Sequence, residues 1–491
     1  MGKRHMSQKV AVSVVYVAAL FMTIMDSTIV NVALPTIGRQ FHVRLDAVDA
    51  VSIGFLVSLA VFIPASGWLG DRFGGRRVLL AAIAVFVVAS ALCGVSTSLG
   101  ELVGFRVLQG VGGGMMTPVG MAMFFRTFPP EERVRAASIL VVPTALAPAL
   151  GPVIGGLFVT DLSWRWVFYV NVPVGVLALL FGLAFVDRYD GESPGRFDLP
   201  GFVLAAAGLG LVMYGVSEGP VKGWGSPPIV ATCLLGALTL VAMVVVELRS
   251  RAPVIDLGLL RDRLFRSCSA VLVLGSIPFI GVLFLVALFY QDGLGLTALQ
   301  SGLSTFPEAI GVMLGAQLVT RALYPVFGPT RVMVAGLLML AASLALMSQV
   351  GATTNLWWMR LLIFLCGVGM SGVFVPAQAA GFATITPAAT ARASTMFNGF
   401  RYLAGAAGVA GLTTVLAAVG PLRFAGGHEV PHLAAYHAAF VTGAAIAVLA
   451  AVASLTVSDY DARATMVRRG RGAKRDWQPE RSETSETELV S

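Results

Sequence analysis

The feature that most constrains the fold is a series of long apolar segments separated by short charged loops. A helix needs about twenty apolar residues to cross a bilayer, and hydropathy with helix-breaking residues places fourteen such segments in the 491 residues. Hydrophobic residues make up 57% of the chain and charged residues 12%, far from soluble-protein usage. We therefore predict an all-α integral membrane protein. Its predicted spans are residues 10–34, 49–69, 78–96, 102–124, 136–159, 166–186, 199–217, 228–247, 268–290, 301–320, 331–350, 357–377, 397–418 and 435–457.

The distribution of basic residues predicts the orientation of these spans. The first span lacks a small-residue cleavage site, so we expect a retained helix rather than a signal peptide. An even number of spans places both termini on one side. Of the 34 Lys and Arg residues, 26 lie in the termini and in the loops on that side, and five lie in the opposite loops. This asymmetry predicts cytoplasmic termini, and it explains the net charge of +8 without a nucleic-acid partner.

The chain also contains an internal repeat. Residues 73–78 (Phe-Gly-Gly-Arg-Arg-Val) return 254 positions later as residues 327–332 (Phe-Gly-Pro-Thr-Arg-Val), and Arg106 falls on Arg360 at the same offset. Each basic loop joins two apolar segments, as in transporters built from two related halves around a central site. The offset covers eight spans, which a six-span unit with two added helices explains.

This repeat divides the chain into four predicted parts. They are a six-span half (1–186), two inserted spans with their linker (187–266), a second six-span half (267–458) and a charged tail (459–491). From Arg468 onward the tail starts basic and ends acidic, so we expect it to be disordered on the cytoplasmic side. A plain solvated tail and a tail held near the anionic lipid surface are both compatible with this composition.

Asp26 is the acid that lies deepest in a predicted span. A carboxylate in mid-span is costly, so it is expected to face protein or water and to serve a function. Span directions place Asp26 about 12 Å and Arg106 about 6 Å below the outer ends of their helices. A guanidinium stabilises the carboxylate, whereas burial stabilises the acid. The pair therefore predicts a proton site, and a purely structural, hydrogen-bonding acid is the alternative.

Glu308 is the second acid within a predicted span. It follows Pro307, which frees a backbone carbonyl and often marks a bend at a cavity, and it lies about 10 Å below the outer edge. We expect Glu308 to face the same cavity as Asp26 from the opposite half. There it would carry a second proton or pair with cationic substrates. The alternative is an acid in the outer loop.

The other chemistry-bearing residues predict neither a metal site nor a cofactor. The four cysteines lie in or beside different spans without the spacing of metal ligands. His428, His432 and His437 cluster near the last outer loop, but Pro431 breaks their helical spacing and no cysteine joins them. No phosphate-binding Walker motif is present, which disfavours direct use of ATP.

Several motifs carry a resemblance to a known family. Residues 67–77 (Gly-Trp-Leu-Gly-Asp-Arg-Phe-Gly-Gly-Arg-Arg) resemble the cytoplasmic loop signature of the major facilitator superfamily. Residues 25–35 resemble the first-span motif of its fourteen-span drug:proton antiporters, the multidrug efflux type. Residues 106–114 and 151–156 resemble the fourth-span motif and the antiporter motif, and residues 164–173 resemble the junction of spans 5 and 6. The second half resembles the family more loosely.

The resemblance implies two six-helix halves with two inserted helices, and it implies roles for particular residues. Asp26 is implied to carry the exchanged proton, with Arg106 as proton relay or charge-balancing partner. Asp71 is implied to latch onto the start of the 397–418 span, where a helix N-terminus attracts anions.

Two further groups of residues take their implied roles from the same motifs. Arg72 and Arg76 accompany the latch, although both also fit the ordinary excess of positive charge in a cytoplasmic loop. A small-residue face in the fifth span is implied to pack closely and to bend, which favours antiport over symport. Its residues are Gly151, Pro152, Gly155 and Gly156.

We therefore expect a secondary active transporter of a bacterial inner membrane, not an enzyme. It would export drug- or antibiotic-like amphipathic compounds in exchange for protons, as a monomer, with no cofactor and no nucleic-acid partner. A proton-coupled importer or exporter of one metabolite is the nearest alternative, and the antiporter motif disfavours import. A membrane-embedded enzyme would need a His-rich or paired-acid cluster inside the spans, and a channel would not need two repeated halves.

Overall fold

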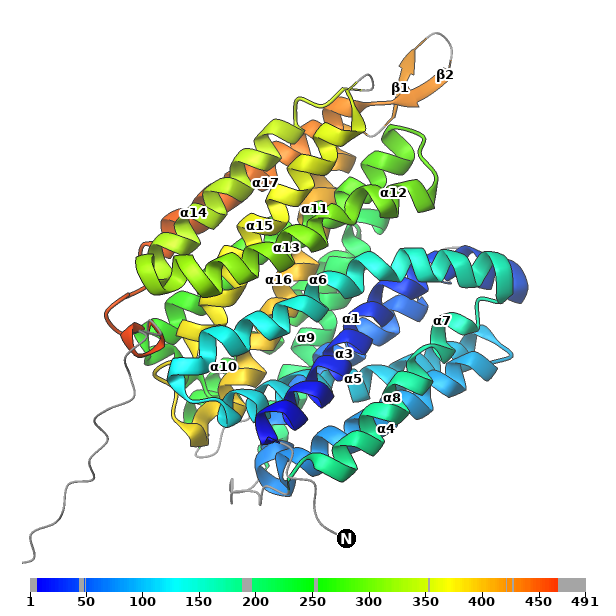
Figure 1. Cartoon of the computed structure of the whole chain (residues 1–491). Coiled ribbons are helices and arrows are strands. Elements are labelled where there is room, and N and C mark those ends of the chain that lie inside the picture. The colour runs from blue at the N-terminus through cyan, green and yellow to red at the C-terminus, as the bar shows by residue number, and fades with distance from the viewer. Residues whose placement is uncertain are drawn as a thin grey trace, which may run out of the picture.

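Long helices dominate the structure, because inside a bilayer only intrahelical hydrogen bonds satisfy the whole backbone. The computed structural model describes residues 7–43, 48, 50–187, 197–250, 255–351, 354–420, 422–425 and 428–466. Figure 1 shows two helical bundles, the first formed by the early blue-to-teal part of the chain and the second by the green-to-red part. The predicted all-α membrane architecture is confirmed.

The helix bounds follow the order of the sequence. The first half contains α1 (Gln8–Phe41), α3 (Ala50–Phe73), α4 (Gly75–Val95), α5 (Leu99–Thr127), α6 (Arg133–Leu157) with a π-helical turn (Phe158–Leu162), α7 (Trp166–Tyr169) and α8 (Asn171–Phe185). The inserted helices are α9 (Leu199–Lys222) and α10 (Pro227–Arg249). The second half contains α11 (Arg263–Leu288) with a π-helical turn (Phe289–Gly293), α12 (Ala298–Thr305), α13 (Pro307–Leu318) with a π-helical turn (Val319–Leu323), α14 (Tyr324–Met347), α15 (Leu356–Gly381), α16 (Thr390–Val419) and α17 (Leu433–Ser454).

Short elements connect these helices. An antiparallel hairpin of β1 (Leu422–Ala425) and β2 (His428–Pro431) projects between α16 and α17 (Figure 1). The 3-10 turns are η1 (Pro130–Glu132), η3 (Leu257–Arg261), η6 (Pro387–Ala389) and η7 (Arg463–Thr465).

The repeat in the sequence is also present in the backbone. Gly74 precedes α4 with a φ of 86°, and its counterpart Gly328 in α14 has a φ of 76°. Both values lie in the left-handed region that glycine tolerates, so the two loops turn in the same way. Helix packing repeats as well. α3 and α4 pack on α5 as α13 and α14 pack on α15, and α1 packs on α6 as α11 packs on α16. The boundaries of the four predicted parts stay a prediction.

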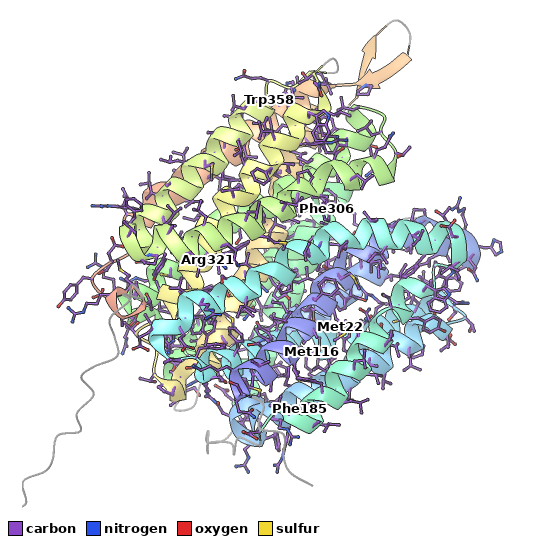
Figure 2. The ribbon with its side chains drawn as sticks, viewed as in Figure 1. Met22, Met116, Phe185, Phe306, Arg321 and Trp358 are labelled. Carbon is purple, nitrogen blue, oxygen red and sulfur yellow. The ribbon has the colours of Figure 1, made fainter. Side chains whose placement is uncertain are left out.

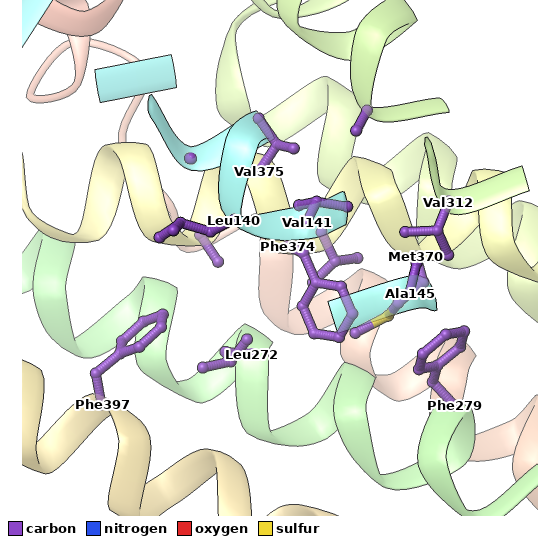
Figure 3. Close-up of a cluster of buried hydrophobic side chains, with 14 of the residues drawn as sticks. Leu140, Val141, Ala145, Leu272, Phe279, Val312, Met370, Phe374, Val375 and Phe397 are labelled. Atoms are coloured by element: carbon purple, nitrogen blue, oxygen red, sulfur yellow. The ribbon is translucent and has the colours of Figure 1, made fainter. Parts of the chain in front are cut away.

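The two halves meet along α6 and α16. α6 packs against α13 and α15, and α16 packs against α3 and α5. Figure 3 shows Val141 and Ala145 of α6 beside Phe374 of α15 in one apolar cluster. Phe125 at the end of α5 stacks on Phe382, with 5.0 Å between ring centroids. Apolar packing therefore holds α6 and α16 against the opposite half.

The inserted helices pair with each other and contact both halves through α9. This helix packs against α3 of the first half and α16 of the second. A cavity of about 530 Å³ lies between α9, α3 and α5. Glu218 and Lys222 of α9 line it and form an ion pair of 2.7 Å. The other inserted helix, α10, has only 17% of its most apolar window buried, as expected of a helix facing lipid.

Both ends of the described chain lie at one end of the molecule, which we call the terminal end (Figure 1). Lys9 forms an ion pair of 2.7 Å with Glu132, and the Tyr324 hydroxyl lies 2.6 Å from the Thr465 hydroxyl. The turns η1 and η7 are also in contact. This arrangement agrees with an even number of membrane crossings.

Some helix ends differ from the predicted spans. α1 continues to Phe41 rather than ending at residue 34, and α16 begins at Thr390 rather than near residue 397. The predicted span 301–320 is divided at Phe306, where α12 ends and Pro307 begins α13. Figure 2 labels Phe306 at this break. Hydropathy marks lipid contact, whereas these helices continue into the loops at both membrane surfaces.

Twelve helical segments of the described ranges are long and apolar enough to cross a membrane. One of them, Gln300–Met347, is 48 residues long and includes α12, α13 and α14. α5 is not among the twelve, because Arg106 and its many glycines lower its hydropathy. The count of fourteen spans stays a prediction.

Candidate functional site

Asp26 lies at the centre of a buried polar cluster in the first half. Its carboxylate forms an ion pair with Arg106 of α5 and accepts a hydrogen bond from the guanidinium Nη1. Gln109 Nε2 of α5 and Asn171 Nδ2 of α8 each donate to Asp26 Oδ1 at 2.9 Å. None of the four side chains is more than 1% exposed. Three helices of one half therefore converge on a single acid.

Ser90 of α4 joins the cluster from a fourth helix. Its hydroxyl accepts hydrogen bonds from Gln109 Nε2 at 3.1 Å and from Asn171 Nδ2 at 3.2 Å. The same hydroxyl donates to the carbonyl oxygen of Phe168 at 2.9 Å. Since each amide donates to both Ser90 and Asp26, the orientation of both amides is fixed.

The Arg106 guanidinium is held by contacts beyond Asp26. Its Nε donates to the carbonyl oxygen of Val51 at 3.2 Å, and its Nη1 also donates to Gln109 Oε1 at 2.7 Å. Its Cζ atom lies 4.1 Å from the ring centroid of Phe55, a favourable cation–π distance. Arg106 therefore faces the protein interior, and the predicted proximity of Arg106 and Asp26 is present in the structure.

The donors around Asp26 match its ionised form, because hydrogen bonds to a charged acceptor are stronger than hydrogen bonds between neutral groups. A proton added to Asp26 would remove the charge that balances Arg106 and leave a buried guanidinium poorly compensated. The attraction between α1 and α5 would therefore weaken if Asp26 bound a proton. Sequence reasoning did not single out Gln109, Asn171 or Ser90, although the first two lie within recognised motifs.

The predicted small-residue face of α6 packs on α1 next to this cluster. A Cβ added at Gly155 would lie 2.9 Å from the carbonyl oxygen of Ile29, and one at Gly151 would meet the Thr28 side chain. Both contacts are within one turn of Asp26. Gly156 is different, because an added Cβ would meet no atom within 4 Å. Gly156 therefore does not belong to this contact.

The side chain of Pro152 lies outside the described residues. Its place in the small-residue face stays a prediction. α6 has helical structure through this position and continues to Leu157.

Glycines of α5 allow the neighbouring helices to approach closely. A Cβ at Gly112 would lie 2.8 Å from the Ala82 carbonyl oxygen of α4, and one at Gly110 would lie 2.5 Å from the Phe55 carbonyl oxygen of α3. These distances are shorter than van der Waals contact, so only glycine fits. The predicted tight packing of this glycine-rich segment is present on two faces of α5.

Gly112→Val is expected to destabilise the first half by about 1–3 kcal/mol, the usual cost of overpacking a well-packed core. The control is Gly104→Val on the same helix, where an added Cβ meets nothing within 4 Å. Thermal unfolding of the purified protein in detergent should show a lower Tm for Gly112→Val than for Gly104→Val. Equal Tm values would contradict the close α4–α5 contact.

The predicted contact between Asp71 and the start of α16 is made through Arg126, which was not predicted from the sequence. Arg126 Nη2 at the end of α5 donates to Asp71 Oδ1 at 3.1 Å, and Arg126 Nε donates to the carbonyl oxygen of Pro387 at 3.0 Å. Pro387 lies in η6, directly before α16. Arg126 thus connects the end of α3 with the start of α16 in the opposite half.

Further contacts support this junction. The Ser66 hydroxyl lies 3.3 Å from the Thr395 hydroxyl, and a Cβ at Gly67 would lie 2.8 Å from that same hydroxyl oxygen. The junction therefore starts at Thr390 and η6 rather than near residue 397, because α16 begins earlier than predicted.

The two arginines predicted to accompany the latch lie elsewhere. Arg76 Nη2 donates to the carbonyl oxygen of Leu183 near the end of α8, at 2.7 Å, within the first half. Arg72 is exposed in the last turn of α3. Neither donates to α16 in the described part of the chain, so Arg126 is the basic residue that bridges the halves at this junction.

Glu308 is buried, with 3% of its surface exposed, and lies in the first turn of α13. It lies on the same face of α13 as Gly311 and Gly315, which pack against α15. The hydrogen-bond partners of Asp26 all come from the first half. The structure therefore does not bring Glu308 and Asp26 together, and Glu308 lies within the second half.

Arg360 differs from its repeat counterpart Arg106. Its guanidinium lies 3.2 Å from the Ser304 hydroxyl and 4.6 Å from the ring centroid of Trp357. Trp358, beside it, lies at the end of the bundle opposite the terminal end (Figure 2). These contacts fit a side chain that extends towards the membrane surface.

The histidine cluster forms no joint site in the described ranges. His432 Nδ1 lies 2.9 Å from the carbonyl oxygen of Gly420, and His437 Nε2 lies 2.9 Å from that of Val350. The side chain of His428 lies outside the described residues. Among the residues that the structure places, no group of three or more His, Cys, Asp or Glu side chains is arranged to hold a metal ion.

Similar proteins come from two sequence comparisons. The family model described as Major Facilitator Superfamily matches residues 16–409. The chain is 31% identical over 407 residues to the multidrug resistance protein B homolog of Mycobacterium tuberculosis, covering 82% of this chain and 75% of the relative. It is 34% identical over 375 residues to the tetracenomycin C resistance and export protein of Streptomyces glaucescens, covering 74% of this chain and 70% of that relative.

Solved structures with the same fold are more distant in sequence. The human organic anion transporter MFSD10 (TETRAN) has a TM-score of 0.65 at 17% identity, covering 91% of this chain and 99% of that chain. The proton:xylose symporter XylE has a TM-score of 0.59 at 15% identity, covering 91% of this chain and 95% of that chain. The family match across most of the chain, the relatives above 30% identity and the shared fold show that this chain belongs to the major facilitator superfamily of membrane transporters, which are not enzymes.

Proposed function

We propose that this transporter exports drug- or antibiotic-like amphipathic compounds in exchange for protons. The observation that carries the proposal is the buried cluster around Asp26, in which an ionisable acid inside a membrane helix is paired with Arg106. Relatives at 31% and 34% identity are named for multidrug resistance and for antibiotic resistance and export. The α6 glycines support antiport, because the residues that resemble the antiporter motif pack on α1 beside the Asp26 cluster.

In this proposal a proton enters from outside and neutralises Asp26. The loss of charge weakens the attraction between α1 and Arg106 on α5, so the first half adjusts its packing on α6 and the two halves move relative to each other. Substrate binding from the cytoplasmic side then returns the transporter to its starting conformation. A membrane potential supplies about 2.3 kcal/mol per charge per 100 mV for the cycle.

We also propose the arrangement in the cell. The charge asymmetry of the loops favours cytoplasmic termini in a bacterial inner membrane. The terminal end, with the Asp71–Arg126 junction, would then face the cytoplasm. We propose a monomer with the four-part division predicted from the sequence, in which α9 and α10 are inserted between two six-helix halves.

The proposal is tested in inverted membrane vesicles that hold an inward-acid pH gradient. Adding an exported compound should release protons from the vesicle interior and collapse the gradient, and vesicles without the protein should show no such change. A panel of amphipathic antibiotics and dyes would identify the compounds that act. A pH gradient that stays unchanged with every compound accumulated by the protein would contradict proton exchange.

We propose Glu308 as a second proton-binding group in the opposite half. It is buried in the second half, on the face of α13 that packs against α15. Glu308→Gln keeps the shape and removes titration, so we expect about half as many protons exchanged per substrate molecule, with export reduced rather than abolished.

The measurement compares substrate flux and proton flux in the same vesicles. Asp161→Asn, at an exposed position in the first half, is the control. An unchanged ratio of protons to substrate in Glu308→Gln would remove Glu308 from the mechanism. A larger loss for cationic than for neutral compounds would instead assign it to substrate recognition.

A further inference from the structure

Arg401 is a charged residue in the middle of α16 that the proton cycle does not use. It is the twelfth residue of a 30-residue helix, about 16 Å from the helix start. α16 is surrounded by α3, α5, α9, α11 and α17, so this position lies between the two halves. A guanidinium at such depth is costly unless it meets a partner or water.

No protein group neutralises Arg401 in the part of the chain that the structure describes. The five ion pairs found there involve other residues. The Arg401 Cζ atom lies 5.5 Å from the ring centroid of the adjacent Tyr402. The Arg401 side chain is only partly buried.

Two tyrosine hydroxyls accompany the guanidinium. Tyr16 of α1 comes from the first half, and Arg401 and Tyr402 both contribute to the electrostatic environment of its buried hydroxyl. The Tyr402 Oη atom is buried without a hydrogen-bond partner among the described residues. An unpaired buried hydroxyl is costly, which points to a ligand or water at this place.

The two carboxylates that we propose as proton sites lie elsewhere, and Glu218 of α9 is paired with Lys222. Asp26 is ten residues beyond Tyr16 on α1, about 15 Å along the helix, and is already paired with Arg106. Glu308 lies on the face of α13 that packs on α15. The group formed by Tyr16, Arg401 and Tyr402 is therefore a set of donors with a net positive charge.

We propose that Tyr16, Arg401 and Tyr402 form a binding site for the anionic oxygen group of an amphipathic substrate, such as a carboxylate. The planar guanidinium donates two parallel hydrogen bonds to a carboxylate, and the tyrosine hydroxyls donate to the remaining lone pairs. Because the donors come from both halves, a bound anion connects α1 with α16. This inference rests on the proposed export function and narrows its substrate class to organic anions, instead of the cations suggested by Glu308.

The experiment measures binding of matched pairs of compounds to the purified transporter in detergent. Each pair is an amphipathic carboxylic acid and its methyl ester, for example dansylaminoundecanoic acid and its ester, followed by fluorescence. The wild type should bind the acid more tightly than the ester. Arg401→Gln should weaken binding of the acid about tenfold or more, the loss expected for a charge-assisted hydrogen-bond pair, and should change binding of the ester little.

Three further variants sharpen the test. Arg401→Lys should restore part of the affinity for the acid, and Tyr402→Phe should weaken it by a smaller factor. Arg360→Gln, which removes an arginine near the start of α15, should leave the affinity for the acid unchanged. If Arg401→Gln fails to fold, the preference of the wild type for acid over ester still decides the question.

Two results would overturn the inference. One is the absence of a preference for the acid in every pair, and the other is an equal loss of acid and ester binding in Arg401→Gln, which would indicate a conformational role. Proton exchange with neutral compounds in vesicles would then leave the proposed function intact. Conversely, anion binding without proton exchange would leave this site intact and contradict the proposed function.

Discussion

Asp26→Asn is expected to abolish proton-coupled export while the protein still folds into the membrane. The amide has the size of the carboxylate and can still accept hydrogen bonds from Gln109 and Asn171, but it cannot bind and release a proton. Inverted vesicles with an imposed pH gradient should therefore accumulate substrate no faster than vesicles that lack the protein. Compared with the wild type, the loss of export should be complete rather than partial, because Asp26 is the acid of the buried cluster that we propose as the proton site.

Two control variants separate titration from structure. Asp26→Glu keeps an acid in the cluster and should retain measurable coupling, although the longer side chain strains the contact with Arg106. Asp161→Asn removes an exposed acid of the same half and should behave as the wild type. If Asp26→Asn exchanged protons at the wild-type rate, another group would be the proton carrier.

The second large effect is expected at the junction of Asp71, Arg126 and Pro387. Asp71→Asn and Arg126→Gln should each slow export about tenfold or more with little change in substrate affinity. The reason is that Arg126 connects α3 and α5 with the start of α16, at the terminal end and away from the Asp26 cluster. Weakening this contact changes the balance between conformations, which sets the rate of the transport cycle.

The measurement compares equilibrium binding and export on the same preparation. Arg392→Gln is the matched control, because Arg392 of α16 forms an ion pair of 2.9 Å with Asp256, outside the first half. That variant should export normally. A loss of binding equal to the loss of export in Asp71→Asn would show that the junction shapes the substrate site instead of the rate of cycling.

The sequence predicted the elements of this structure better than their contacts. Hydropathy located the helices, because apolar length is what a bilayer requires. The pairing of Asp26 with Arg106 was predictable, since two opposite charges at similar depth inside a membrane have strong reason to meet. Gln109 and Asn171 were not singled out, because neutral amides carry no comparable signal, although Gln109 lies one turn from Arg106 on the same face.

Other residues show why the remaining contacts could not be predicted. In the sequence, Arg126 cannot be distinguished from other arginines in the loops predicted to be cytoplasmic. Only the packing of α16 against α5 shows that Arg126 connects the two halves. Glu308 was predicted to lie inside a span and is buried, but a position along a helix does not determine which neighbour that helix face contacts. The glycines at Gly311 and Gly315, at helical spacing from Glu308, were the available signal for packing on α15.

The central claim, that Asp26 carries the proton exchanged for substrate, is tested most directly by proton release from the purified protein. Substrate is added to the transporter in detergent and weak buffer, and the protons released per molecule are measured with a pH-sensitive dye. The wild type should release protons on saturation with substrate, and Asp26→Asn should bind the same substrate with a clearly smaller release, limited to the share that Glu308 contributes. Equal proton release from the wild type and Asp26→Asn would contradict the claim.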